Sequence, residues 1–158
     1  MHWFGYRCIV RHMAEMEASV TIARPLNEVF ACFLAVDEIA AKTDPGVSSI
    51  SKTPDGPPGP GTTFHFRQET LGKVRETTTT YTAVDTDRRI DFNAVIGPMR
   101  PRCSLSFETT DGGTRVTFRG EANPVGAFKA LSRLFNRKGQ KVWQERLSRA
   151  REALEADA

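Results

Sequence analysis

The sequence predicts an α+β domain in which one strand and two short helices precede six strands and one long helix. Three observations support this class. The run ASVTIA (18–23) alternates apolar and polar residues as a half-buried strand does, and helical spacing replaces this alternation at Pro25. Residues 61–122 have the composition of strands separated by short turns. Helical spacing returns after Asn123-Pro124 and continues to the end of the chain.

Pro25 is expected at the first position of a helix, because proline lacks an N–H and fixes φ near the helical value. The apolar spacing that follows predicts a helix pair or one kinked helix over 26–42. Residues 47–52 are predicted to form a short strand. The proline- and glycine-rich run 53–61 is predicted to be a loop, either the rim of a pocket or a stiff connection between strands.

The second half of the sheet is predicted as five antiparallel strands, because the turns between them are short. Their expected ranges are 62–70, 73–84, 88–95, 102–110 and 114–122. Alternation of apolar and polar residues selects an inner face rich in phenylalanine. Its members are Phe64, Phe66, Ile90, Phe92, Ala94, Cys103, Leu105, Phe107, Val116 and Phe118. Apolar residues change parity in strand 73–84, which predicts a β-bulge near Thr82.

A helix of up to eight turns is predicted after Asn123-Pro124, which resembles a helix cap followed by a proline at the first helical position. The apolar stripe expected to cover the sheet is Val125, Phe128, Leu131, Phe135 and Val142, with Trp143, Leu147 and Leu154 rotated to one side. Gly139 indicates either a kink or close packing under the helix. The basic side chains are expected to face solvent and to contribute little to function: Lys129, Arg133, Arg137, Lys138 and Lys141.

The composition indicates one globular domain over 16–158, preceded by a loosely ordered N-terminal extension over 1–15. A net charge of +3 is only mildly basic, so no nucleic-acid partner is expected. Three widely spaced cysteines without a CxxC motif favour reduced thiols in the cytoplasm, with no metal and no cofactor. No apolar run is long enough for stable membrane insertion. The oligomeric state is left open.

Four segments carry a resemblance to a known superfamily: VTIARPLNEVFACFLAVDEI (20–39), PGTTFHF (60–66), AVDTDRRIDF (83–92) and the helix after ANP (122–124). From about Glu17 onward, the chain resembles the START-like or SRPBCC superfamily, and within it the polyketide cyclase/dehydrase-like group. This resemblance implies the helix-grip fold, a curved seven-stranded antiparallel sheet wrapped around the long C-terminal helix. It also implies an apolar cavity between sheet and helix.

The leading functional hypothesis is binding of a small hydrophobic molecule or lipid in that cavity. The residues expected to bind it are Phe33, Phe64, Phe66, Tyr81, Phe92, Phe107, Phe128, Leu131 and Phe135. Tyr81 is the expected polar contact. One alternative is an aromatase/cyclase-type enzyme acting on a polyketide, and another is a protein-partner adaptor that uses the basic C-terminal helix.

No catalytic residue is assigned from the sequence. His65 lies between two inward phenylalanines and is expected on the surface. Glu69 and Glu76 flank a predicted hairpin turn, where they would face each other as paired carboxylates or, as is commoner, remain solvated.

Overall fold

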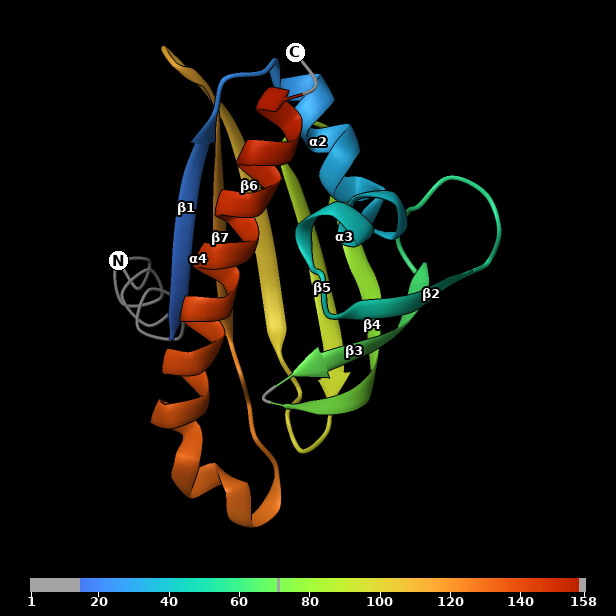
Figure 1. The fold of residues 1–158 in the computed structure, drawn as a ribbon, viewed down its shortest axis with the longest axis vertical. Coiled ribbons are helices and arrows are strands. Elements are labelled where there is room, and N and C mark those ends of the chain that lie inside the picture. Colours follow the sequence, from blue (N-terminus) through green and yellow to red (C-terminus); the bar gives the residue numbers. More distant parts are fainter. Residues whose placement is uncertain (1–14, 71, 157–158) are drawn as a thin grey trace, which may run out of the picture.

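The computed structural model describes residues 15–70 and 72–156, and its strands form one antiparallel sheet in the order β1-β7-β6-β5-β4-β3-β2 (Figure 1). The strands are β1 (Met16–Ile22), β2 (Val47–Thr53), β3 (Thr63–Thr70), β4 (Lys73–Asp85), β5 (Arg89–Ile96), β6 (Arg102–Thr110) and β7 (Gly113–Glu121). The helices are α2 (Leu26–Leu34), α3 (Val36–Thr43), the 3₁₀ helix η1 (Gly126–Leu131) and α4 (Ser132–Ala156). The predicted extension 1–15 lies outside the described residues except for Glu15.

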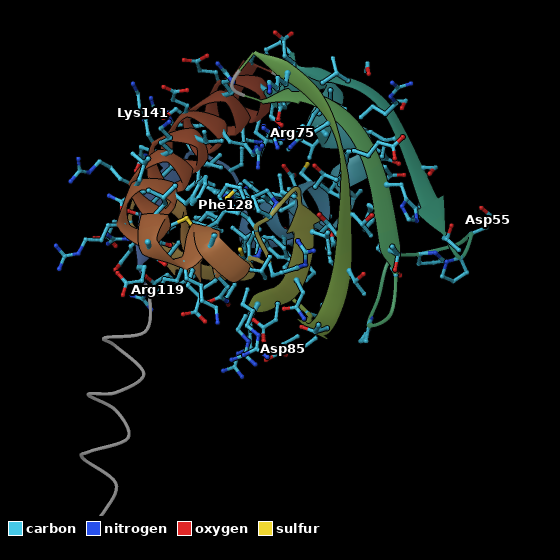
Figure 2. All side chains as sticks on the ribbon, turned by 90° about the horizontal axis from the view of Figure 1, so that it is seen from below. Asp55, Arg75, Asp85, Arg119, Phe128 and Lys141 are labelled. Carbon is cyan, nitrogen blue, oxygen red and sulfur yellow. The ribbon has the colours of Figure 1, made fainter. Side chains whose placement is uncertain are left out.

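The sheet curves around one side of α4, while α2 and α3 cover its upper end (Figures 1 and 2). The first strand of the chain, β1, pairs with the last strand, β7, and lies at one edge of the sheet. Helix α4 packs mainly on β1. This arrangement is the helix-grip fold, so the predicted fold class is confirmed.

The inner face of the sheet is the face that hydrophobic alternation predicts. All ten predicted inward residues are buried, and Phe64, Ile90, Val116 and Phe118 have no solvent exposure. The register of β4 against β5 shifts between Tyr81 and Ala83, which confirms the bulge expected near Thr82. Because the bulge changes the parity of β4 after Tyr81, it allows Tyr81 and Val84, which are three residues apart, both to pack on the core side.

The junction between β1 and α2 has no linker. Pro25 has an extended ψ of 147° and its carbonyl accepts hydrogen bonds from Glu28 and Val29, so α2 begins at Leu26, one residue later than predicted. Ala35 then separates α2 from α3, which confirms a helix pair. The buried Thr114 hydroxyl donates to the Arg24 carbonyl over 2.8 Å and ties this junction to β7.

The start of the C-terminal helix differs from the prediction. Asn123 and Gly126 have positive φ values of 46° and 59°, and Pro124 pairs as a β-bridge with Met99, so neither residue of the expected cap begins a helix. Only the short η1 follows, and α4 begins at Ser132. The tertiary contact with Met99 therefore overrides the local capping signal.

The helix face that covers the sheet also differs from the prediction. The buried side chains of α4 are Asn136, Leu147 and Ala150, with Trp143 and Phe135 partly buried against the core. The remaining members of the expected stripe, Val125, Phe128, Leu131 and Val142, are 40–45% exposed. A Cβ on Gly139 would lie 2.5 Å from the Met16 sulfur, so this glycine permits close packing of α4 on β1.

Candidate functional site

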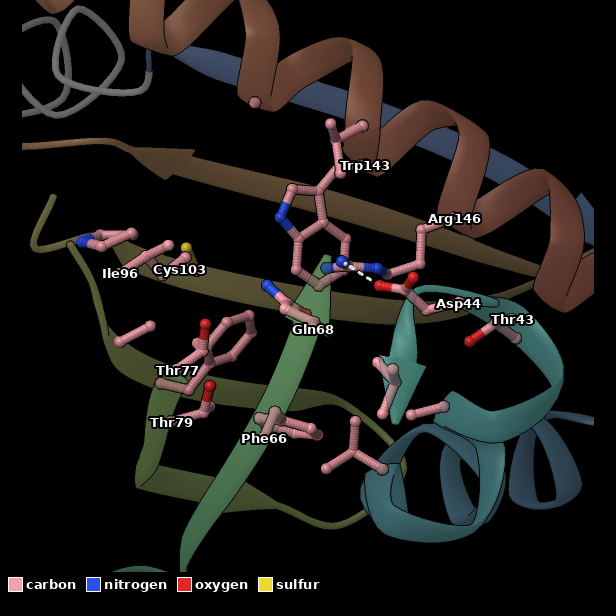
Figure 3. Close-up of a pocket in the computed structure, with 18 of the residues that line it drawn as sticks. Thr43, Asp44, Phe66, Gln68, Thr77, Thr79, Ile96, Cys103, Trp143 and Arg146 are labelled. Atoms are coloured by element: carbon pink, nitrogen blue, oxygen red, sulfur yellow. Dashed lines mark hydrogen bonds and ion pairs between the residues drawn. The ribbon is translucent and has the colours of Figure 1, made fainter. Parts of the chain in front are cut away.

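A cavity of about 360 Å³ lies between the inner face of the sheet, α3 and the middle of α4 (Figure 3). Its walls are mostly apolar. The sheet contributes Phe66, Ile90, Phe92, Ala94, Cys103 and Leu105; α4 contributes Phe135, Gly139, Val142 and Trp143; and α3 contributes Val36, Ile39 and Ala40. The shape follows from the fold, because a single straight helix cannot fill the concave side of a strongly curved sheet.

Trp143 positions α4 over the sheet and forms part of the cavity wall. Its ring stacks on Phe118 with centroids 4.0 Å apart and an interplanar angle of 8°, and it lies 5.9 Å from the ring of Phe92. Phe118 is fully buried behind it, whereas Phe92 borders the cavity. One side of the indole therefore packs in the core while the rest remains exposed to the cavity.

Part of the polar surface of the wall comes from neutral threonine and glutamine side chains. Thr77 and Thr79 project from β4 and Gln68 projects from β3 into the space below α4 (Figure 3). Thr77 is 5% exposed, and its hydroxyl has no hydrogen-bond partner among the described residues. A buried hydroxyl without a partner is costly, so this position favours an incoming polar group that reaches it.

Charged residues lie at the edge of the cavity. The Arg146 guanidinium of α4 donates to the Asp44 carboxylate at the end of α3 over 2.9 Å, and both side chains are about three-quarters or more buried. The Arg146 guanidinium also lies 4.7 Å from the centre of the Trp143 ring. This ion pair joins the helical cover to α4 and closes one side of the cavity (Figure 3).

Tyr81 lines the cavity with its ring but not with a free hydroxyl. The hydroxyl donates to the Leu34 carbonyl over 2.8 Å, with a longer contact of 3.4 Å to the Phe33 carbonyl. Burial, with a smaller effect from the Asp37 carboxylate, raises the pKa of Tyr81 well above its usual value. Its proton therefore ties the end of α2 to the sheet and, in this arrangement, is not available to a ligand carbonyl.

Of the nine predicted ligand-binding residues, the structure brings five together around the cavity: Phe33, Phe66, Tyr81, Phe92 and Phe135. Phe64 is fully buried beneath Phe66 and Tyr81, and Phe107 packs edge-on against Phe30 and Phe33 under α2. Phe128 and Leu131 lie in η1 and are exposed, because the chain does not become α-helical until Ser132. The prediction that the cavity extends to Phe128 and Leu131 is therefore wrong.

Several residues of the site were not predicted. Trp143 had a usable signal, because its spacing to Leu147 and Ala150 places all three on one helical face. The pair Asp44 and Arg146 had none, since 102 positions separate the two residues. Thr77 was hidden by the run of threonines on both faces of β4.

The polar residues considered from the sequence lie outside the interior. His65 is exposed, and its Nδ1 lies 3.3 Å from the Thr78 hydroxyl, as a surface position predicts. Glu76 is opposite Arg67 in the β3–β4 ladder and Glu69 is opposite Val74. The two carboxylates therefore do not face each other, and only Glu69 reaches the edge of the cavity.

Cys103 is expected to resist alkylation despite lining the cavity. Burial raises the pKa of its thiol to about 12, with a smaller opposing effect from Arg146. The thiol is therefore protonated at pH 8, and labelling by N-ethylmaleimide should be about a thousandfold slower than for an unburied thiol. Peptide mass spectrometry over a pH series measures the labelling rate of Cys103. Half-maximal reactivity near pH 8.5 would show that burial does not raise the pKa of this thiol.

Among the described helices, none combines the length and apolar character required to cross a membrane. Within the same described ranges, no group of three or more histidine, cysteine, aspartate or glutamate side chains is arranged to hold a metal ion.

Solved structures with the same fold have low sequence identity to this chain. The protein TTHA0849 from Thermus thermophilus is 20% identical with a TM-score of 0.74, and the match covers 90% of this chain and 98% of that one. Ara h 8.0201 is 19% identical with a TM-score of 0.64, covering 85% and 95% of the two chains. The di-domain ARO/CYC StfQ from the steffimycin biosynthetic pathway is 13% identical with a TM-score of 0.72, covering 87% of this chain and 49% of StfQ.

No curated protein sequence matches the chain. The family model described as polyketide cyclase / dehydrase and lipid transport matches residues 13–157, which include every described strand and helix. The curved sheet, the helical cover and the cavity beneath α4 agree with that match. The chain therefore belongs to the polyketide cyclase / dehydrase and lipid transport family.

Proposed function

We propose that this protein binds a small hydrophobic molecule or lipid in the cavity between the sheet and α4. The observation that carries the proposal is the cavity itself, whose volume of about 360 Å³ is enclosed mainly by apolar side chains. Ligand pockets typically measure about 300 to 1,000 Å³ and combine apolar walls with a few polar groups. This cavity is at the small end of that range, which favours a compact ligand or one chain of a lipid.

The distribution of charge supports a ligand that is mostly neutral and apolar. The neutral polar groups are those of Thr77, Thr79 and Gln68. The charged side chains that line the cavity balance in sign, three acidic (Asp44, Glu69 and Glu145) and three basic (Lys138, Arg146 and Arg149), and Asp44 pairs with Arg146. The cationic side chains that line the cavity come from α4, whereas Thr77 is on β4. An anionic group buried beside Thr77 would have no cation from the same strand to pair with, so a neutral hydroxyl or carbonyl group suits this position better. The buried thiol of Cys103, which forms no disulfide, fits the cytoplasmic location that we also propose.

An aromatase/cyclase-type reaction is the second candidate, suggested by the family description and by the likeness to StfQ. It is the weaker candidate because three of the groups in the wall that could act as acids or bases are already engaged, and Glu69 and Glu145 are the carboxylates of the wall that remain. Tyr81 uses its proton within the protein, Cys103 is held as a thiol, and the Asp44 carboxylate is engaged by Arg146. General acid-base chemistry requires a group that can exchange protons with the substrate.

Filling the cavity is expected to weaken binding of a hydrophobic probe. Ala94 on β5 faces the cavity, so Ala94→Phe should weaken binding of the neutral fluorophore N-phenyl-1-naphthylamine at least about tenfold, a loss of roughly 1.4 kcal/mol. The matched control is Val95→Phe, because Val95 is the next residue and points out of the sheet with 45% of its surface exposed. Fluorescence titration of the native protein gives both affinities.

Two results would contradict the proposed function. The first is equal binding by the Ala94→Phe and Val95→Phe variants, which would place the probe elsewhere. The second is probe binding that occurs only in partly denaturing urea, as for a loosened core. Native mass spectrometry of the purified protein then identifies a co-purified ligand and tests whether its mass is lost in Ala94→Phe.

A further inference from the structure

The first half of the C-terminal helical region presents apolar and basic side chains together on the molecular surface. We call this surface the basic apolar strip. Its apolar members are Val125, Phe128, Leu131, Leu134 and Val142, each 40–45% exposed, and its basic members are Lys129, Arg133, Arg137, Lys138 and Lys141, all exposed. Monomeric proteins rarely expose this many large apolar side chains in one contiguous segment, so the strip indicates an interaction surface.

Two apolar and two basic members of the strip share one face of α4. At about 100° per residue, Leu134, Lys138, Lys141 and Val142 fall within an arc of about 100° on α4. The opposite side of α4 carries Asn136 and Leu147 and packs on the sheet. Figure 2 views this end of the molecule, with Phe128 beside the first turns of the helical region and Lys141 on the outer side of α4.

The segment that carries the basic apolar strip has charged side chains of one sign only. Residues 122–144 contain five lysines and arginines and no aspartate or glutamate, although the chain as a whole has 22 basic and 19 acidic residues. The rest of the chain therefore has more acidic than basic residues. The mild net charge of +3 thus conceals a locally cationic surface, which attracts an anionic partner.

We infer that the basic apolar strip docks reversibly on an anionic lipid surface. Helices that lie at a bilayer interface combine lysine and arginine with exposed phenylalanine and leucine, which enter the boundary between headgroups and acyl chains. Phe128, Leu131 and Leu134 supply those apolar groups, and the neighbouring cations pair with lipid phosphates.

RNA and a second copy of the chain fit the combination of exposed apolar and basic side chains less well than an anionic lipid surface does. RNA would engage the cations and one aromatic ring, but it gives no reason for exposed valines and leucines. A second copy of the chain packed through the same face would bring two sets of like charges together. The strip also adjoins the cavity, because two of its members, Lys138 and Val142, line it. Docking would bring this edge of the cavity to the lipid surface, although the inference does not depend on the cavity being occupied.

Sedimentation with vesicles tests the inference on the full-length protein. The probes are vesicles of phosphatidylcholine alone and vesicles with about one-third phosphatidylglycerol, each at low and at raised salt. We expect binding to the anionic vesicles, little binding to the neutral ones, and at least about tenfold weaker binding when raised salt shortens the Debye length from about 10 Å to a few Å.

Two variants divide the strip into its chemical parts. Phe128→Ser with Leu131→Ser removes apolar insertion, and Lys129→Glu with Arg133→Glu reverses charge; each should weaken anionic-vesicle binding about tenfold or more. All four side chains are exposed, so the fold should persist, as circular dichroism would check. The matched control is Val74→Ser with Arg115→Glu on β4 and β7, where both side chains are also exposed, and it should bind as the wild type does.

The inference is overturned if the wild type does not bind anionic vesicles, or if the strip variants bind them as the control does. It is also overturned if the strip variants lose binding to a single-stranded RNA while vesicle binding is unchanged, which would assign the surface to nucleic acid. A dimer in sedimentation velocity that the Phe128→Ser, Leu131→Ser variant dissociates would also overturn it. The Ala94→Phe variant separates the two proposals, because it should lose N-phenyl-1-naphthylamine binding in the cavity and still bind anionic vesicles through the strip.

Discussion

Phe118→Ala is expected to lower the free energy of unfolding by about 3 to 5 kcal/mol, the range for a buried phenylalanine whose loss leaves a cavity. Phe118 has no solvent exposure, and its ring lies flat against Trp143 with centroids 4.0 Å apart. The change would remove the main aromatic contact between β7 and α4. Urea denaturation followed by far-UV circular dichroism measures the loss.

Phe92→Ala is the matched comparison, because Phe92 also contacts Trp143 but borders the cavity. Its ring already lacks neighbours on one side, so removing it should cost less, about 1.5 to 3 kcal/mol. Equal losses for the two variants would show that side chains fill the space beside Phe92 in solution. That result would argue against the proposed ligand-binding function while leaving the fold unaffected.

The strands and the inner face of the sheet could be predicted from the sequence because their signals are local. A side chain in a strand alternates between faces, so residues such as Phe64 and Phe66 identify the buried side without any knowledge of the neighbouring strand. The bulge in β4 was also predictable, since the apolar residues on either side of Thr82 change parity.

The orientation of the C-terminal helix could not be predicted in the same way. Its sequence contains two apolar stripes that are slightly rotated from each other, and propensity does not choose between them. The choice is made by tertiary contacts: Gly139 packs on Met16, and the Asn136 side chain accepts a hydrogen bond from the Ala122 N–H over 2.9 Å. Both contacts join the helix to parts of the chain more than ten residues away in sequence.

This wrong assignment has a functional consequence. A stripe that was expected to cover the cavity lies partly outside it, so Phe128 and Leu131 change from expected ligand contacts to members of the exposed basic apolar strip. The basic side chains do face solvent, as predicted, but they do so beside apolar neighbours. The sequence shows both sets of residues, and only the helix orientation shows that they share a surface.

The helical cover above the cavity depends on a close approach at the β6–β7 turn. Gly113 has a φ of 130°, which residues with a side chain rarely adopt, and a Cβ there would collide with the Ile22 carbonyl oxygen and lie 2.9 Å from the Ala23 Cα. Both atoms belong to the backbone at the end of β1, and the buried Thr114 hydroxyl holds the adjacent Arg24 carbonyl. Space for a side chain at this position would require the β1–α2 junction to move.

Gly113→Ala is therefore expected to destabilise the protein by about 3 kcal/mol or more, since backbone strain and steric overlap each cost about 1 to 3 kcal/mol. Gly112→Ala is the control: its Cβ would meet Thr21 at an ordinary 3.5 Å, so its stability should change by less than about 1 kcal/mol. Urea denaturation of the two variants gives the difference. A mild effect at Gly113 would mean that the junction yields easily, and the direct passage from β1 into α2 would then not be what holds the helical cover over the cavity.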